Sequence, residues 1–235
     1  MPDIRADFSR PALVRRSDAR FVPSPSAGVE RILLDRIGDE VARATSFVRY
    51  APKSRFPFHH HAMGEEYIVL SGVFSDASGD YGEGSYVRNP PGSGHAPWSD
   101  PGCEIFVKLR QFSDADRDFV HHQLFGGQME SGVQTLHRFG TEQIFHQKLS
   151  EHEAVNIAFE HGLELLVLRG SVAIQRTTDP RAADRMQGWE AVYHDGEALN
   201  LEPHDWLRLP RNGFLALTSH EDAHIWCKTG HLPTR

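Results

Sequence analysis

The feature that most constrains this chain is a pair of short histidine motifs set between strand-like runs. The first motif is His59-x-His61-x3-Glu65, and the second is a glycine- and proline-rich turn that ends at His95. Residues two apart in a strand point to the same face of a sheet, so His59 and His61 can face one cavity. Three imidazoles and one carboxylate are typical ligands of a transition metal. The sequence therefore predicts a metal site at His59, His61, Glu65 and His95, with His60 on the opposite face.

The runs around these motifs are short and rich in β-branched and aromatic residues. We expect strands at Glu30–Arg36, Val41–Tyr50, Tyr67–Phe74, Ser85–Arg88 and Glu104–Phe112, and a polar bend over Ser75–Gly82. Turn residues separate these runs at short intervals, and no long helical pattern interrupts them. This combination favours an all-β barrel or sandwich.

The second half of the chain contains a weak internal repeat. Leu163–Gly170 is similar to Glu65–Gly72 at an offset of 98 residues, and Trp206–Phe214 is similar to Tyr86–His95 at an offset of about 119. The change in offset predicts about 21 extra residues in the polar stretch Arg176–Gly196. Two homologous barrels in one chain would explain the repeat.

The repeat predicts that the second barrel lacks the metal site. The positions equivalent to the four ligands become Ile157, Phe159, Leu163 and Phe214, which are all apolar. A buried imidazole or carboxylate without a metal or a partner is costly, so apolar filling is the stable alternative. We expect the second barrel to be structural or to hold an apolar ligand.

The two histidine motifs together resemble the paired signature of the cupin family. The flanking segments ERILLDRIGDEVARATSFVRYAP and GVFSDASGDYGEGSYVRNPPGSGHAPWSDPGCEIFVKLRQ resemble the cupin domain of ChrR-type anti-sigma factors, over about residues 21–112. The resemblance implies an all-β chain of two cupin barrels (double-stranded β-helix, or jelly roll) in tandem. We expect an N-terminal arm at residues 1–28, a metal-binding barrel at 29–120 and a degenerate barrel at 121–235. In this family the ligands would be His59, His61, Glu65 and His95.

The resemblance to ChrR-type proteins does not extend to the N-terminus. Those proteins carry a sigma-binding helical domain with its own His/Cys zinc site before the cupin domain. Here no cysteine precedes Cys103, and residues 1–28 read as an extended arm or edge strand. We therefore do not expect a sigma factor as partner.

Composition excludes several other classes of function. The net charge of −7 does not imply a nucleic-acid-binding face, and no apolar run approaches the length of a membrane span. The N-terminus lacks the apolar core of a signal peptide. Cys103 and Cys227 suggest no disulfide framework. We expect a cytoplasmic protein with no membrane or nucleic-acid partner, and a homodimer is compatible with the sequence.

The ligand types fit one divalent transition metal, Zn, Fe, Ni or Mn, and do not choose among them. An octahedral site with open positions would suit a small-molecule dioxygenase, whereas a closed tetrahedral zinc site would suit a ligand- or oxidant-sensing regulatory protein. Whether the chain is an enzyme stays open, and no catalytic residue is assigned. The residues that we expect to contact a small-molecule substrate, by proximity to the motifs, are Tyr67, Arg88, Trp98 and Arg110.

Overall fold

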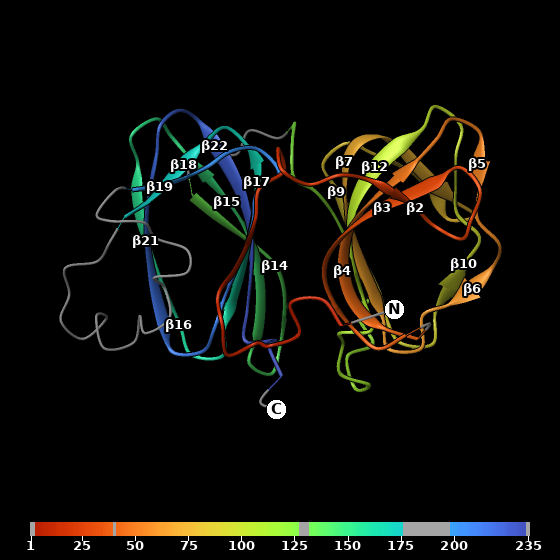
Figure 1. The fold of residues 1–235 in the computed structure, drawn as a ribbon, viewed down its shortest axis with the longest axis horizontal. Coiled ribbons are helices and arrows are strands. Elements are labelled where there is room, and N and C mark those ends of the chain that lie inside the picture. Colours follow the sequence, from red (N-terminus) through yellow and green to blue (C-terminus); the bar gives the residue numbers. More distant parts are fainter. Residues whose placement is uncertain (1–2, 40, 127–131, 176–197, 234–235) are drawn as a thin grey trace. The chain divides into compact units, whose positions relative to one another are not determined.

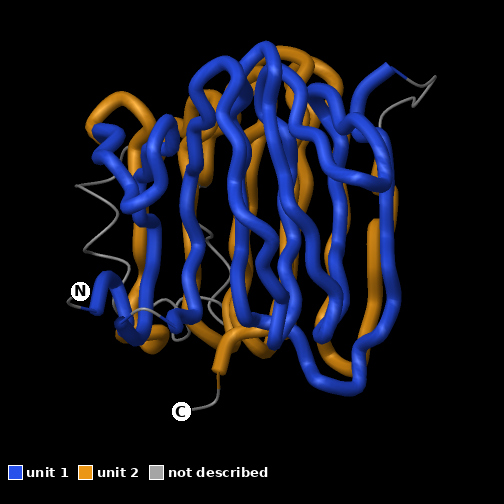
Figure 2. Tube along the Cα trace, turned by 90° about the vertical axis from the view of Figure 1, so that its right-hand side faces the viewer, with its two compact units in different colours: residues 1–6, 20–127 blue, residues 7–19, 128–235 orange. Residues whose placement is uncertain are grey.

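The computed structural model describes residues 3–39, 41–126, 132–175 and 198–233, and every regular element in these ranges is a strand (Figure 1). In these ranges no helix has the length and apolar character to cross a membrane. The chain divides into two compact units (Figure 2). Unit 1 comprises residues 1–6 and 20–127, and unit 2 comprises residues 7–19 and 128–235. The extra residues predicted within Arg176–Gly196 lie outside the described ranges.

Unit 1 is built around one large sheet with the strand order β13-β9-β7-β12-β4-β3-β2, and a two-stranded sheet of β10 and β6. All pairings within it are antiparallel. Its strands are β2 (Val22–Pro23), β3 (Val29–Ile37), β4 (Arg43–Tyr50), β5 (Ser54–Arg55), β6 (His59–His60), β7 (Glu65–Asp76), β8 (Gly79–Gly82), β9 (Ser85–Asn89), β10 (Gly94–His95), β11 (Trp98–Ser99), β12 (Cys103–Leu109) and β13 (Val120–Gln123).

Unit 2 contains a six-stranded sheet in the order β1-β20-β17-β22-β15-β14 and a four-stranded sheet in the order β16-β21-β18-β19. Its strands are β1 (Ala12–Val14), β14 (Gly132–Phe139), β15 (Glu142–Leu149), β16 (Ala154–Phe159), β17 (Leu163–Arg169), β18 (Val172–Gln175), β19 (Leu199–Leu201), β20 (Trp206–Leu209), β21 (Gly213–Ser219) and β22 (Ala223–Thr229). The all-β fold class is confirmed.

The first 28 residues, expected as one arm, are divided between the units. Ile4 forms an isolated antiparallel bridge to Arg36 in unit 1. Ala12–Val14 is an edge strand that pairs with β20 in unit 2. Ala12 and Val14 are buried. The strand also covers the edge of that sheet, which leaves fewer backbone groups unpaired there.

One local expectation is wrong. The polar segment Ser75–Gly82, predicted as a bend, is mostly strand, because β7 runs on to Asp76 and β8 pairs back along it. Phe74 and Tyr81 are buried in this hairpin. Serine, glycine and aspartate dominate the segment and hide the pairing, because hydrophobic alternation is weak where few residues are apolar.

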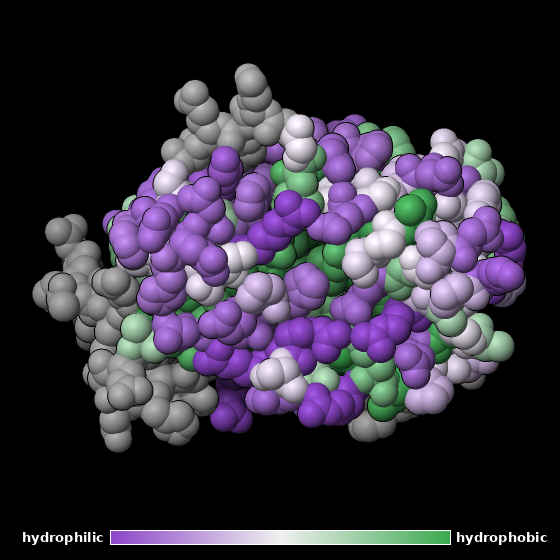
Figure 3. Space-filling view, turned by 90° about the horizontal axis from the view of Figure 1, so that it is seen from above, coloured by the Kyte–Doolittle hydropathy of each residue, from purple (hydrophilic) through white to green (hydrophobic). Residues whose placement is uncertain are grey.

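Each unit has its own apolar core. The core of unit 1 is rich in aromatic and β-branched side chains, such as Tyr67, Phe74 and Val87, and that of unit 2 is rich in leucine, such as Leu163, Leu207 and Leu217. Seen from above, the surface is mostly hydrophilic, and apolar side chains show mainly in the recesses between polar ones (Figure 3).

The strand registers of the two units correspond closely. Glu65 lies opposite Asn89 and Leu109 in unit 1, and Leu163 lies opposite Leu209 and Thr229 in unit 2. This correspondence preserves the predicted offset of 98 for β7 and β17, but gives 120 for the strands around β9 and β20 (209 − 89). It supports the interpretation of two related barrels in tandem.

The register also corrects one equivalence. His95 lies opposite His59, whereas Ile157 lies opposite Leu215, not Phe214. Leu215 is therefore the residue in the position of His95, one residue later than predicted. It is 1% exposed and belongs to the core of unit 2.

Candidate metal centre

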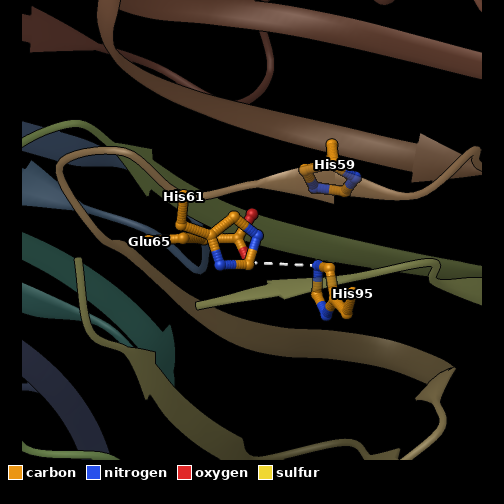
Figure 4. Close-up of side chains that lie close together, drawn as sticks. All are labelled: His59, His61, Glu65 and His95. Atoms are coloured by element: carbon orange, nitrogen blue, oxygen red, sulfur yellow. Dashed lines mark ion pairs between the residues drawn. The ribbon is translucent and has the colours of Figure 1, made fainter. Parts of the chain in front are cut away.

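The structure brings the four predicted ligands together. One ligand atom from each of His59, His61, Glu65 and His95 lies within 4.8 Å of the others. The Nε2 atoms of His61 and His95 are each 3.4 Å from Glu65 Oε2, within the ~3–4 Å expected of donors that share one ion at ~2.0–2.2 Å. Figure 4 shows the three imidazoles and the carboxylate converging on one space.

Local backbone structure explains how these residues meet. His59 on β6 and His95 on β10 are direct cross-strand partners. Gly94 lies opposite His60, and a Cβ on Gly94 would be only 2.6 Å from the backbone oxygen of His59. The close pairing of the two strands therefore needs glycine at this position.

A tight bend between His61 and Glu65 brings the chain from β6 to the start of β7. Gly64 adopts a φ of +76°, and a Cβ there would be 2.3 Å from the ring of Phe112. The bend allows Glu65, on a different strand, to join the two histidines, as the spacing of the first motif predicts.

Hydrogen bonds fix the orientation of all three imidazoles. Nδ1–H of His95 donates to Asp76 Oδ2 at 2.8 Å, and that of His59 to the carbonyl oxygen of Pro57 at 3.1 Å. Nδ1–H of His61 donates to Ser93 Oγ at 3.0 Å, whose own hydroxyl donates to the carbonyl oxygen of Pro90. These bonds assign the proton to Nδ1 and leave the Nε2 lone pair for a metal.

The remaining ring atoms fit a metal. Nε2 of His61 and Nε2 of His95 are buried and have no hydrogen-bond partner among the described residues. A buried nitrogen acceptor without a partner is destabilising, and a bound cation removes that cost. The donor set and its orphaned atoms therefore fit a divalent transition metal, which these four residues could hold.

Electrostatics around the site favour a neutral imidazole at His61 and an ionised carboxylate at Asp76. Burial lowers the pKa of His61 to about 4, although Glu65 opposes the shift. Burial alone would raise the pKa of Asp76, but its hydrogen bonds with His95 and Ser78 outweigh burial, so the pKa of Asp76 lies below its ordinary value. Asn89 Nδ2 donates to Glu65 Oε2 at 3.1 Å, which orients the fourth ligand.

A cavity of about 700 Å³ opens onto the site, and His59, Glu65 and His95 line it. Its apolar wall includes Val48, Tyr50, Phe56, Phe74, Ile105 and Val107. This volume lies within the ~300–1,000 Å³ typical of small-molecule pockets. The candidate ligands are thus accessible to a small molecule from one side.

The four predicted substrate contacts do not line this cavity. Arg88 lies on the face of the sheet opposite Glu65, where it forms ion pairs with Glu66 at 2.9 Å and Asp116 at 2.6 Å. Arg88 was expected at the cavity because it is close to the motifs in sequence. Alternate residues of a strand point to opposite faces, so closeness in sequence does not place a side chain in the cavity. Glu66 lies on the same face as Arg88 and is 1% exposed.

The other three are placed as follows. Tyr67 is buried in the apolar core of unit 1, and the guanidinium of Arg55 lies 5.4 Å from the centre of the Trp98 ring. Arg110 follows β12 with a φ of +60° and donates its backbone N–H to Gly64.

Sequence reasoning missed the residues that support and surround the site. Asp76, Ser93 and Asn89, which hold the ligands, fall in segments read as bend or turn. Two arginines that line the cavity, Arg31 and Arg36, lie an odd number of residues apart on β3. They share a face only because the register shifts between Leu33 and Asp35, a β-bulge that alternation cannot reveal.

Comparison with known proteins agrees with this fold. Residues 9–113 match the family model described as the ChrR cupin-like domain. No curated protein sequence matches the chain. The N-terminal half of the chain therefore contains a segment similar to the ChrR cupin-like domain.

Solved structures that resemble the chain share its fold at low identity. Protein Ylba from E. coli has 11% identity and a TM-score of 0.68, and the match covers 100% of this chain and 96% of that one. The bacterial pirin YhhW from E. coli, in complex with nickel(II), has 13% identity and a TM-score of 0.65, over 93% and 98%. A candidate dioxygenase from Nostoc punctiforme has 13% identity and a TM-score of 0.63, over 100% and 84%.

Proposed function

We propose that unit 1 is a metal-dependent dioxygenase site that acts on a small, largely apolar molecule. The observation that carries this proposal is the cavity that reaches His59, Glu65 and His95. A purely structural metal site is closed by its ligands, whereas a catalytic one keeps an accessible side. A nickel complex and a candidate dioxygenase among the similar structures support the proposal.

In this proposal the four ligands hold one divalent metal, which would supply Lewis acidity and the redox chemistry that O2 requires. The chain's own residues do the rest. Asp76, Ser93 and Asn89 keep three of the ligands in place, and the apolar wall around Phe74 and Val107 excludes water from a bound substrate.

The test is metal content with coordination geometry. Elemental analysis of the purified protein, followed by X-ray absorption at the edge of the metal found, should show iron, nickel or manganese with six ligands including exchangeable water. Oxygen uptake should then follow addition of a catechol or a diketone. Four-coordinate zinc without bound water, or no uptake with any redox-active metal, would contradict the dioxygenase proposal.

A second candidate function is a ligand- or oxidant-sensing regulatory protein. The match of residues 9–113 to the ChrR cupin-like domain favours it. Here the metal would be closed zinc and the output a change in binding to a partner protein. Co-purification of a sigma factor that depends on the zinc-loaded state would favour this function over the enzyme.

A further inference from the structure

The cavity of unit 1 has two chemically different ends. One end holds the candidate ligands His59, Glu65 and His95, and the wall between is apolar. The other end is lined by two arginines, Arg31 and Arg36. A ligand that fills the cavity would therefore contact the candidate metal ligands at one end, apolar side chains along its length, and the two arginines at the other end.

The strand register places the arginine end across the sheet from the metal end. Glu65 pairs with Leu109, Leu109 with Ala44, and Ala44 with Arg36, so these residues form one cross-strand row. Three strand spacings separate β7 from β3, about 14 Å at ~4.8 Å per strand. Arg31 lies further along the sheet, opposite Val48 and four residues along β4 from Ala44, so a ligand that reaches Arg31 from the metal end must be at least as long as an aromatic ring with a short substituent.

The two guanidinium groups differ in their partners, and the positive charge of Arg36 acts on the carboxylate of Asp39. Arg36 Nε donates to the carbonyl oxygen of Gly38 at 3.2 Å, and its Nη2 donates to that of Asp39, which are neutral acceptors. Among the residues that the structure describes, no hydrogen bond or ion pair holds the guanidinium of Arg31. The carboxylate at this end belongs to Asp39, which is exposed.

Arg31 is in an environment that favours an anion. Burial lowers the pKa of its guanidinium below the ordinary value, and the nearby charge of Arg36 lowers it further. A desolvated cation beside a like charge gains from a bound anion. The planar guanidinium binds a carboxylate through two parallel hydrogen bonds, an arrangement stronger than neutral hydrogen bonds.

We propose that the cavity recognises an aromatic carboxylate, with its carboxylate at Arg31 and its opposite end at the candidate metal ligands. This inference rests on the proposed function, since it assigns a substrate class to the same site. Arg31 is a binding and specificity residue in this arrangement, and it takes no part in the chemistry at the metal end.

The test compares two probes that differ only in charge: 3,4-dihydroxycinnamate, which is anionic, and its methyl ester, which is neutral. Zinc-loaded protein is used because zinc has no redox chemistry, so that binding is measured without turnover. Isothermal titration at pH 7.5 gives the dissociation constants, and the series is repeated with metal-free protein. Variants are Arg31→Gln and, as a matched control, Arg49→Gln.

Arg49 is a suitable control because it lies between Val48 and Tyr50, which line the cavity, and so occupies the other face of β4. It contacts Glu104 at 3.2 Å and Glu30 at 3.9 Å. Loss of its charge changes the net charge of the protein as much as Arg31→Gln does, without changing the cavity.

The acid should bind about tenfold more tightly than the ester. Arg31→Gln should reduce this ratio to within about twofold, whereas Arg49→Gln should leave it unchanged. The ratio should persist without zinc, while the affinity of both probes falls. If neither probe binds, or if Arg31→Gln leaves the ratio intact, the inference is overturned. If the ratio behaves as expected but zinc adds nothing to either affinity, the proposed function fails at the metal and the anion site stands.

Discussion

Units 1 and 2 share a pairing register but differ in the residues that face inward. In unit 1 the inward positions include His59, Glu65 and His95, and in unit 2 the equivalent positions of Glu65 and His95 are Leu163 and Leu215. Leu163 and Leu215 are at most 1% exposed and belong to the core. The same framework thus surrounds a cavity in one unit and an apolar core at those positions in the other.

The face opposite the inward side differs much less between the two units. In unit 1, Glu66 lies beside Arg88 and Lys108 in the sheet, and in unit 2, Glu164 lies beside Arg208 and Lys228 in the same register. All six side chains are at most 1% exposed. Removing one member of a buried charge network is costly, because it leaves the others uncompensated. We infer that this charged row supports the fold of both units, whereas the inward residues are free to define a site or a core.

The largest expected effect separates the two faces of the sheet formed by β6 and β10. His95→Ala should weaken metal binding by more than a hundredfold, because loss of a ligand exceeds the ~10–100-fold cost of losing its supporting partner. Competition titration against a chromophoric chelator measures the affinity. His60→Ala is the control, because His60 is exposed and its ring contacts Phe58 instead of the site.

Two outcomes would contradict this prediction. Loss of the metal in His60→Ala together with retention in His59→Ala would mean that the strand register around β6 is wrong. Retention of the metal in both His59→Ala and His95→Ala would remove the metal site from unit 1.

The second prediction concerns the cost of removing the side chain at the equivalent position in each unit. Leu215→Ala should lower the free energy of unfolding of unit 2 by about 3 kcal/mol, since it leaves a void in a closed core. His95→Ala in metal-free protein should cost unit 1 less, about 1–2 kcal/mol, because His95 borders a cavity that already exists and the main loss is its hydrogen bond to Asp76. Urea unfolding followed by the fluorescence of Trp206 and Trp226, both buried in unit 2, measures the first variant.

Hydrogen exchange of β7 and β17 in the same two variants gives a local measurement for each unit. Equal loss of protection in the two strands would contradict the view that unit 2 has a filled interior where unit 1 has an open one.

The sequence predicted one part of this comparison well and another part poorly, for physical reasons. The clustering of the four candidate ligands could be predicted, because His59 and His61 share strand parity and Glu65 follows a glycine bend. Their role as metal ligands stays a prediction. The two arginines that line the cavity could not be predicted from the sequence. The bulge between Leu33 and Asp35 changes which residues of β3 face the cavity. Likewise the sequence assigned the position equivalent to His95 to Phe214 instead of Leu215. A one-residue shift in the turn before β21 cannot be located without the pairing partner of Leu215, which is Ile157.

The smallest expected effect uses a buried histidine of unit 2. His146 Nε2 lies 2.9 Å from His224 Nδ1, and burial lowers the pKa of His146 to about 4, with the charge of His224 adding to the shift. The pKa in the unfolded chain is near ~6.5. The unfolded state therefore binds the proton more readily, so stability is complete above pH ~6.5 and declines as the pH falls toward about 4.

Between pH 7.5 and 5, unit 2 should lose roughly 2 kcal/mol of stability from this group. Urea midpoints followed by the fluorescence of Trp206 and Trp226 measure the loss. His146→Gln keeps a polar side chain without the titration and should flatten the profile over this range. His152→Gln is the control, because His152 is exposed and should leave the profile unchanged. A pH profile that stays equally steep in His146→Gln would mean that other groups make unit 2 acid-sensitive, and that its interior tolerates charge at this position.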